Sequence, residues 1–240
     1  MSFESPKFET KSEAETSKQE TLNRYLTGLG LTEEELRDKK ILDLGCGEKG
    51  EFVEKILDSG ITQEIFGLDS AINPDNIDEK YKEHLLNGDF QKEFPLKDLD
   101  YVISVGAIEP ALEERETRDP KKTILSALEA LKDNGEVRIF PIRSVEPDSG
   151  LEGIIESRKK WLEILDDLSA QGLIDYEINP VQTRTSANET DTWTEEVLII
   201  KKKITDGFTD FRIPARSFYL LDLNNVFHSR FQCHGAKQDH

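Results

Sequence analysis

Short apolar runs alternate with helical patterns through the middle of the chain. Runs typical of buried strands lie at 40–44, 65–68, 84–87, 100–105 and 136–140. Between them apolar residues recur at helical spacing, as in Phe52, Val53, Ile56 and Leu57. Strands that are apolar throughout and alternate with helices predict a parallel sheet covered by helices on both faces.

The last part of this pattern is different. Trp161, Leu165 and Leu168 mark a fifth crossover helix, but no helical pattern separates the apolar runs at 174–178 and 196–200. A polar, Thr-rich stretch joins these two runs, which predicts a hairpin. Five β–α units and the hairpin predict an α/β fold: a doubly wound, mostly parallel seven-stranded sheet with an antiparallel last strand.

The two ends of the chain differ from the predicted domain at 19–203. Residues 1–18 are rich in Ser, Glu, Lys and Thr, which predicts a mobile N-terminal tail. Residues 204–240 are too apolar for a disordered tail, since they include Phe208, Phe211, Phe218, Tyr219, Leu220, Leu221, Phe227 and Phe231. We expect this extension to pack on the domain or at the contact of a homodimer, and a cover over the substrate pocket is the alternative.

Composition narrows the function and the setting. The 240 residues suit one large domain, and the net charge of −18 disfavours broad contact with nucleic acid or anionic membranes. No apolar run approaches the roughly 20 residues of a membrane span, and no secretory signal is evident. Cys46 and Cys233 are the only cysteines, so we expect a reducing, cytoplasmic setting. His228, Cys233, His234 and His240 match no zinc spacing, and no metal site is predicted.

The strongest local signal is a glycine-rich segment between the first strand and its helix. Gly45, Gly47 and Gly50 match the G-x-G-x-x-G pattern, in which the backbone passes close to a ligand and a helix directs its free N–H groups toward it. Asp69, nineteen residues later, supplies an acid suited to ribose hydroxyls. These features fit a nicotinamide cofactor as well as S-adenosylmethionine.

Asp43 and the closing hairpin favour S-adenosylmethionine over a nicotinamide cofactor. Dinucleotide-binding folds normally place an apolar residue two positions before the first glycine, where this chain has Asp43. A carboxylate there suits the cationic amino acid end of S-adenosylmethionine and sits badly beside a pyrophosphate.

The chain resembles the class I S-adenosylmethionine-dependent methyltransferases, which have a Rossmann-like fold. The similarity lies in Ile-Leu-Asp-Leu-Gly-Cys-Gly at 41–47, Gly-Leu-Asp at 67–69 and Asn-Gly-Asp-Phe at 87–90. It implies that Asp69 holds the ribose, that Asp89 accepts from the adenine amino group and that the Phe90 main chain faces the ring. The implied cofactor site comprises Asp43, Gly45, Cys46, Gly47, Asp69, Ser70, Asp89, Phe90 and Ser104.

The resemblance implies methyl transfer to an unidentified small-molecule or protein acceptor. The third glycine comes late, at Gly50, and segment 104–110 lacks the Asn/Asp-Pro-Pro-aromatic motif of enzymes that methylate amino groups of bases. Glu109 fits a base, a cation-binding carboxylate or a solvated loop acid. No catalytic residue is predicted, because the sulfonium already activates the methyl group. The alternatives are a non-catalytic S-adenosylmethionine-binding or scaffold protein and, less favoured, an NAD-dependent oxidoreductase.

Overall fold

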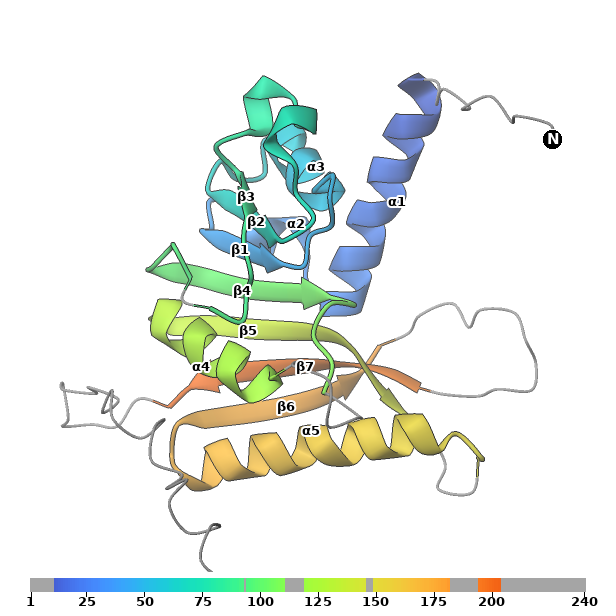
Figure 1. Cartoon of the computed structure of the whole chain (residues 1–240), viewed down its shortest axis with the longest axis vertical. Helices are drawn as coiled ribbons and strands as arrows, with labels where there is room; N and C mark the ends of the chain where they lie inside the picture. Colours follow the sequence, from blue (N-terminus) through green and yellow to red (C-terminus); the bar gives the residue numbers. More distant parts are fainter. Residues whose placement is uncertain (1–10, 93, 111–118, 146–148, 182–193, 204–240) are drawn as a thin grey trace, which may run out of the picture. The chain divides into compact units, whose positions relative to one another are not determined.

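The computed structural model of the chain describes residues 11–92, 94–110, 119–145, 149–181 and 194–203. These residues form a seven-stranded sheet and its covering helices (Figure 1). The strands are β1 (Ile41–Leu44), β2 (Ile65–Asp69), β3 (Leu85–Asn87), β4 (Leu99–Val105), β5 (Leu131–Ser144), β6 (Ile174–Pro180) and β7 (Thr194–Lys202). The α-helices are α1 (Lys11–Leu29), α2 (Glu33–Leu36), α3 (Glu51–Ser59), α4 (Pro120–Ala130) and α5 (Glu152–Ala170), and the 3₁₀ turns are η1 (Pro74–Asn76) and η2 (Glu79–Tyr81).

The strand order is β3-β2-β1-β4-β5-β7-β6. All neighbouring strands are parallel except that β7 runs antiparallel to both β5 and β6. This confirms the predicted fold class, including the antiparallel last strand. The chain moves outward in one direction from β1 to β3 and in the other from β4 onward, so the sheet has its topological switch point between β1 and β4.

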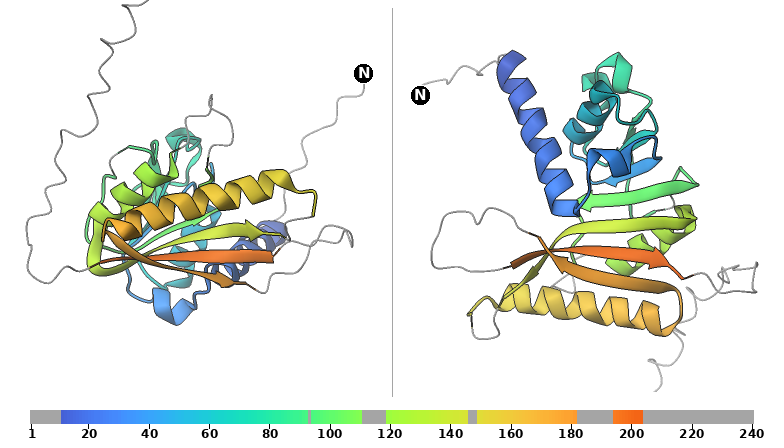
Figure 2. Two further views of the ribbon diagram at one scale, coloured as in Figure 1. Left: turned by 90° about the horizontal axis from the view of Figure 1, so that it is seen from below. Right: turned by 180° about the vertical axis from the view of Figure 1, so that it is seen from behind.

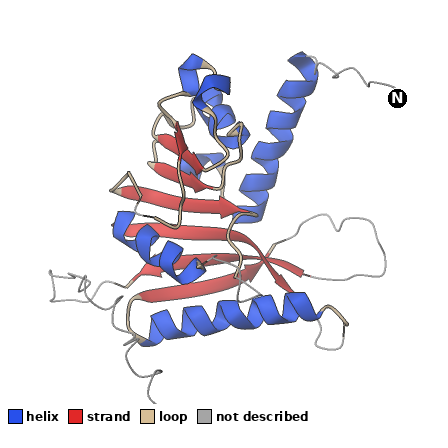
Figure 3. Cartoon of the chain, viewed as in Figure 1, coloured by secondary structure: helices blue, strands red, loops and turns tan. Residues whose placement is uncertain are grey.

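Helices lie on both faces of the sheet (Figures 2 and 3). A hydrophobic core lies on each face. Alternate residues of a strand point to opposite faces, and β1 shows this directly. Leu42 and Leu44 join the core under α4 and α5, whereas Ile41 joins the core under α1 and α3. Asp43 therefore shares the α1 and α3 face with Ile41.

Helix α1 is fixed to that face by close contacts. Its Tyr25 ring stacks on Phe52 of α3 with the ring centres 4.1 Å apart. Gly28 allows close packing, since a Cβ there would lie 2.6 Å from the Phe140 ring. The buried Arg138 guanidinium donates to the carbonyls of Leu29 and Gly30 at 2.9 and 2.8 Å, which satisfies the end of the helix.

Several local predictions differ from the structure. Helix α1 begins at Lys11, so part of the predicted tail is helical, because the hydrophobic stripe marks only the packed half of the helix. Helix α4 ends directly at β5, whose first residue, Leu131, pairs with Leu99. The β2–β3 connection contains 3₁₀ turns, and the described part of the β3–β4 connection has no α-helix, so two of the five predicted crossover helices are absent there.

Some predictions fall outside the described residues. These concern the first ten residues, the extension 204–240 and the cluster of His228, Cys233, His234 and His240. Within the described ranges, no group of His, Cys, Asp and Glu residues could hold a metal ion. No helix in the same ranges is both long enough and apolar enough to cross a membrane.

Candidate cofactor site

The candidate site lies where the carboxyl ends of β1 and β4 meet. In open α/β sheets, the switch point between two such strands forms a crevice in which ligands bind. The glycine segment leaves β1 at this point and enters α3, whose first turn receives no side-chain cap. Backbone N–H groups at the start of such a helix favour polar or anionic ligand atoms.

Each of the three glycines has a backbone conformation that disfavours other residues, with φ of 74° at Gly45, 78° at Gly47 and 59° at Gly50. A Cβ on Gly45 would lie 2.1 Å from the Ala107 Cβ, and one on Gly50 would lie 2.3 Å from Leu85. A Cβ on Gly47 would meet no atom within 4 Å. Gly45 and Gly50 therefore permit close packing, whereas Gly47 leaves the backbone open to a ligand. The late third glycine thus serves the approach of α3 to β3.

Asp43 is the most unusual residue of the site. It is fully buried, and neither carboxylate oxygen has a hydrogen-bond partner. Burial raises the pKa of Asp43 to about 8. The nearby Tyr25 hydroxyl lowers this pKa, although it forms no hydrogen bond of good geometry with the carboxyl group. The charge of the Asp69 carboxylate raises the pKa further. A buried carboxyl group without a partner is costly, which indicates a place prepared for a cationic or hydrogen-bonding group.

Asp69 joins the end of β2 to the glycine segment. Its Oδ2 accepts from the Gly47 N–H at 2.9 Å and its Oδ1 accepts from the Ala71 N–H at 2.8 Å. Each carboxylate oxygen can accept more than one hydrogen bond, so these contacts fix the carboxylate and leave capacity for ribose hydroxyls. Ser70 beside it is exposed, and its carbonyl accepts from the Asn87 side chain at 3.1 Å.

Asp89 and Phe90 follow β3 on the other side of the crevice. Asp89 is exposed, and its Oδ1 accepts from the Gln91 N–H at 2.9 Å, which shapes the turn. The half-buried Phe90 ring approaches the glycine segment, with its Cε1 3.7 Å from the place of a Cβ on Gly45. The structure thus brings the ends of β1, β2 and β3 together, as the sequence predicts.

The side chains of two residues of the predicted cofactor site also make structural contacts. The Ser104 side chain is fully buried, and its hydroxyl donates to the Leu44 carbonyl at 2.9 Å, which ties β4 to β1. The Cys46 sulfur packs against Gly67, where a Cβ would lie 2.6 Å from it. Burial and then the charge of Asp43 raise the pKa of the Cys46 thiol, which supports a packing residue rather than a nucleophile.

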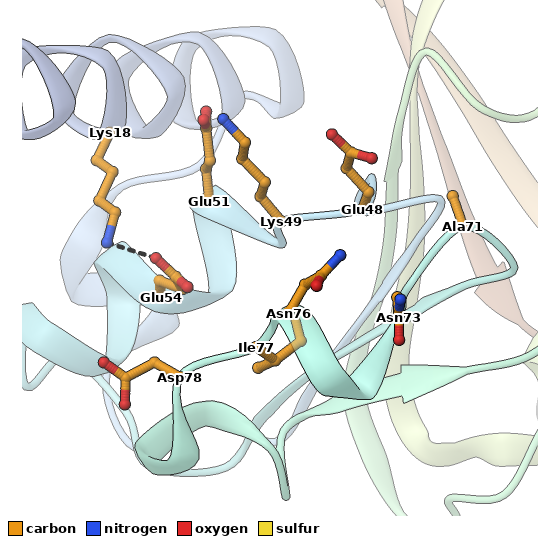
Figure 4. Close-up of a pocket in the computed structure, with 10 residues that line it drawn as sticks. All are labelled: Lys18, Glu48, Lys49, Glu51, Glu54, Ala71, Asn73, Asn76, Ile77 and Asp78. Carbon is orange, nitrogen blue, oxygen red and sulfur yellow. Dashed lines mark ion pairs between the residues drawn. The ribbon is translucent and has the colours of Figure 1, made fainter. Parts of the chain in front are cut away.

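Two hollows flank the glycine segment. One, of about 320 Å³, lies between α1 and the segment, and its wall includes Thr21, Arg24 and Tyr25. The other, of about 380 Å³, lies between the segment and η1, and Glu48, Lys49, Asn73 and Asn76 are among its lining residues (Figure 4). The spacing of the α1 residues predicts a helix but does not show that this helix borders the site.

A third hollow, of about 190 Å³, lies at the same edge of the sheet, where β4 and β5 end and α5 begins. Glu109 lies in its wall together with Pro110, Pro141, Arg143, Ile154 and Trp161. The closest oxygen–nitrogen distance between Glu109 and Arg143 is 4.0 Å.

No known protein-family model and no curated protein matches the sequence. Among solved structures, the chain is similar to a protein of Nostoc punctiforme assigned as an O-methyltransferase, with a TM-score of 0.50 and 14% identity over 80% of this chain and 59% of that one. It is also similar to a protein assigned as a methyltransferase, solved with the Haloferax volcanii Trm112 methyltransferase activator (TM-score 0.49, 18% identity, 80% and 96% covered). A third is the TehB-like S-adenosylmethionine-dependent methyltransferase of Corynebacterium glutamicum (TM-score 0.40, 19% identity, 81% and 100% covered).

The likeness to the Nostoc protein agrees with the strand order and the antiparallel β7. The fold is therefore the Rossmann-like fold of the class I methyltransferases. At 14% identity this likeness concerns the fold, and the function is argued from the site.

Proposed function

We propose that the protein is an S-adenosylmethionine-dependent methyltransferase. The observation that carries this proposal is the buried Asp43 carboxyl group, which has no hydrogen-bond partner and lies beneath a glycine segment at the switch point of the sheet. The positively charged amino group of the cofactor's methionine part supplies the partner that this carboxylate lacks. Asp69, at the end of the adjacent strand, is suited to the ribose hydroxyls, and Asp89 and Phe90 to the adenine.

When bound, S-adenosylmethionine supplies a methyl group that its sulfonium has already activated. The work left to the chain is to hold the acceptor in line with the carbon–sulfur bond and to exclude water, for which good alignment supplies roughly 7–11 kcal/mol in model reactions. Gly45 and Ala107 bring β1 and the end of β4 into contact at the centre of this cleft. No side chain is assigned as a base, since an activated methyl group requires one only for some acceptors.

The same carboxyl group argues against an NAD-dependent oxidoreductase. A dinucleotide places its pyrophosphate over the glycine segment, and an ionised Asp43 beneath it would repel that charge. Ionisation of Asp43 is favoured by a cationic ligand and disfavoured by an anionic one, so the site discriminates between the two cofactors by charge.

Release of S-adenosylhomocysteine tests the proposal as a reaction. Purified protein is incubated with methyl-labelled S-adenosylmethionine and separated small-molecule and protein fractions of a cell extract. We expect label in one fraction and release of S-adenosylhomocysteine, at least tenfold less with Asp43→Asn and unchanged with Asp133→Asn, an exposed acid near the start of β5. Cofactor binding without transfer in any fraction would favour the non-catalytic alternative.

The setting and the assembly are also part of the proposal. The acidic composition and the two cysteines support a cytoplasmic enzyme that acts on a small molecule or a protein rather than on nucleic acid. A homodimer is proposed from the apolar extension 204–240, and light scattering of the full chain beside a chain ending at residue 203 tests it.

A further inference from the structure

The hollow at the ends of β4 and β5 adjoins the candidate cofactor cleft. Ala107 packs against Gly45 of the glycine segment, and Glu109, only two residues later, lies in the wall of the hollow. The Gly106 N–H donates to the Phe140 carbonyl at 2.7 Å, which fixes this connection to β5. One short, anchored stretch therefore borders both spaces, as an acceptor site next to a methyl donor requires.

The hollow is small and partly apolar. Its volume is about 190 Å³. Pro110, Pro141 and Trp161 supply apolar wall, and Trp161 is itself almost fully buried by the core. The space suits a group the size of an amino acid.

The polar part of the wall combines one acid and one base. Glu109 and Arg143 approach only to 4.0 Å, and their side chains are 46% and 43% exposed. An exposed pair of this kind contributes about 0–1 kcal/mol. A guanidinium binds a carboxylate through two parallel hydrogen bonds, and a carboxylate pairs with an ammonium.

The first turn of α5 adds to the anion-binding side. The N-cap residue of this helix, Leu151, makes no side-chain hydrogen bond to the first turn, and Gly153 and Ile154 of that turn lie in the wall of the hollow. The positive end of a 19-residue helix thus lies on the same hollow as Arg143.

On the basis of the proposed function, we propose that this hollow holds the methyl acceptor and that the acceptor is a small zwitterion of amino-acid size. Its carboxylate binds Arg143 and the first turn of α5, and its amino group faces Glu109. A residue inside a peptide chain offers no such pair of opposite charges, so the acceptor is a free small molecule rather than a protein.

Ligand-observed NMR of the full chain with the twenty free amino acids tests this proposal, with and without saturating S-adenosylhomocysteine. We expect at least one of them to bind. Its N-acetyl and its carboxamide derivatives should each bind at least tenfold more weakly, because each lacks one charge-assisted contact. Arg143→Gln should weaken the binding of the free amino acid and of its N-acetyl form. Glu109→Gln should weaken the binding of the free amino acid and of its carboxamide.

The matched control is Arg37→Gln, which removes an exposed ion pair to Glu34 outside the three hollows and should leave amino acid binding unchanged. Binding by none of the twenty, or equal binding of the blocked derivatives, would overturn the proposal. Titration of the same samples with S-adenosylhomocysteine separates the two possible failures. Normal cofactor binding without amino acid binding rejects only the acceptor, whereas loss of cofactor binding in the wild type rejects the proposed function.

Discussion

Replacement of Asp43 by Asn should change stability and cofactor affinity in opposite directions. The folded protein without ligand holds this carboxyl group buried and without a partner, which raises its pKa from 3.8 to about 8. The unfolded chain keeps the ordinary value. Between about pH 4 and pH 8 the folded state therefore binds one proton more than the unfolded state, so stability falls as the pH rises through this window and levels off above it.

The size of this effect follows from the pKa difference. One proton of difference gives a slope of about 1.4 kcal/mol per pH unit, and the whole shift corresponds to a penalty on the order of 5 kcal/mol above pH 8. The side-chain amide of the Asp43→Asn variant does not titrate and escapes this penalty. A change of 1 kcal/mol shifts the melting temperature of a domain of this size by roughly 2–4 °C. The melting temperature of the variant, relative to that of the wild type, should therefore rise by roughly 3–5 °C for each pH unit between 5 and 8.

The assay is thermal unfolding without ligand at half-unit steps from pH 5 to 9, with Asp133→Asn as the control for loss of an exposed acid. The same Asp43→Asn variant should bind S-adenosylhomocysteine at least tenfold more weakly, because its amide cannot neutralise the ligand's ammonium. A difference in melting temperature that does not vary with pH would contradict the raised pKa, since it would show that Asp43 is already ionised in the free protein.

Three further substitutions test neighbouring parts of the structure. Tyr25→Phe removes the hydroxyl that holds down the pKa of Asp43, so the pH at which S-adenosylhomocysteine affinity reaches half of its maximum should rise; an unchanged midpoint in calorimetric titrations would contradict this contact. Gly45→Ala places a Cβ against Ala107 at positive φ and should destabilise the protein by roughly 1–3 kcal/mol in urea unfolding, with loss of cofactor binding. Arg138→Met leaves the Leu29 and Gly30 carbonyls without their donor and should lower the stability of the fold by about 1–3 kcal/mol. Protection of the α1 amides against hydrogen exchange should fall first, and a uniform loss of protection across the sheet would argue against a local role.

The sheet could be predicted from the sequence because its strands are continuous apolar runs with recognisable breaks. The glycine segment and the acids at 69 and 89 could be placed because each follows such a run, and parallel strands bring their carboxyl ends to one edge. The 3₁₀ turns after β2 could not be predicted, since short turns leave no apolar period.

Long-range packing accounts for the features of the site that the sequence did not show. Ser104 lies near the end of a strand, and only the fold shows that its hydroxyl donates to the carbonyl of Leu44, sixty residues away in the chain. Glu109 and Arg143 are 34 residues apart, and only the pairing of β4 with β5 brings them into one hollow. No local pattern contains such information.

Calorimetric titration of the unmodified chain with S-adenosylhomocysteine, and separately with NAD, tests the cofactor assignment most directly. We expect micromolar affinity for S-adenosylhomocysteine, with proton release from Asp43 that appears as a dependence of the heat on the buffer below pH 8, and no binding of NAD. Binding of NAD without binding of S-adenosylhomocysteine, or binding of neither, would contradict the proposed function.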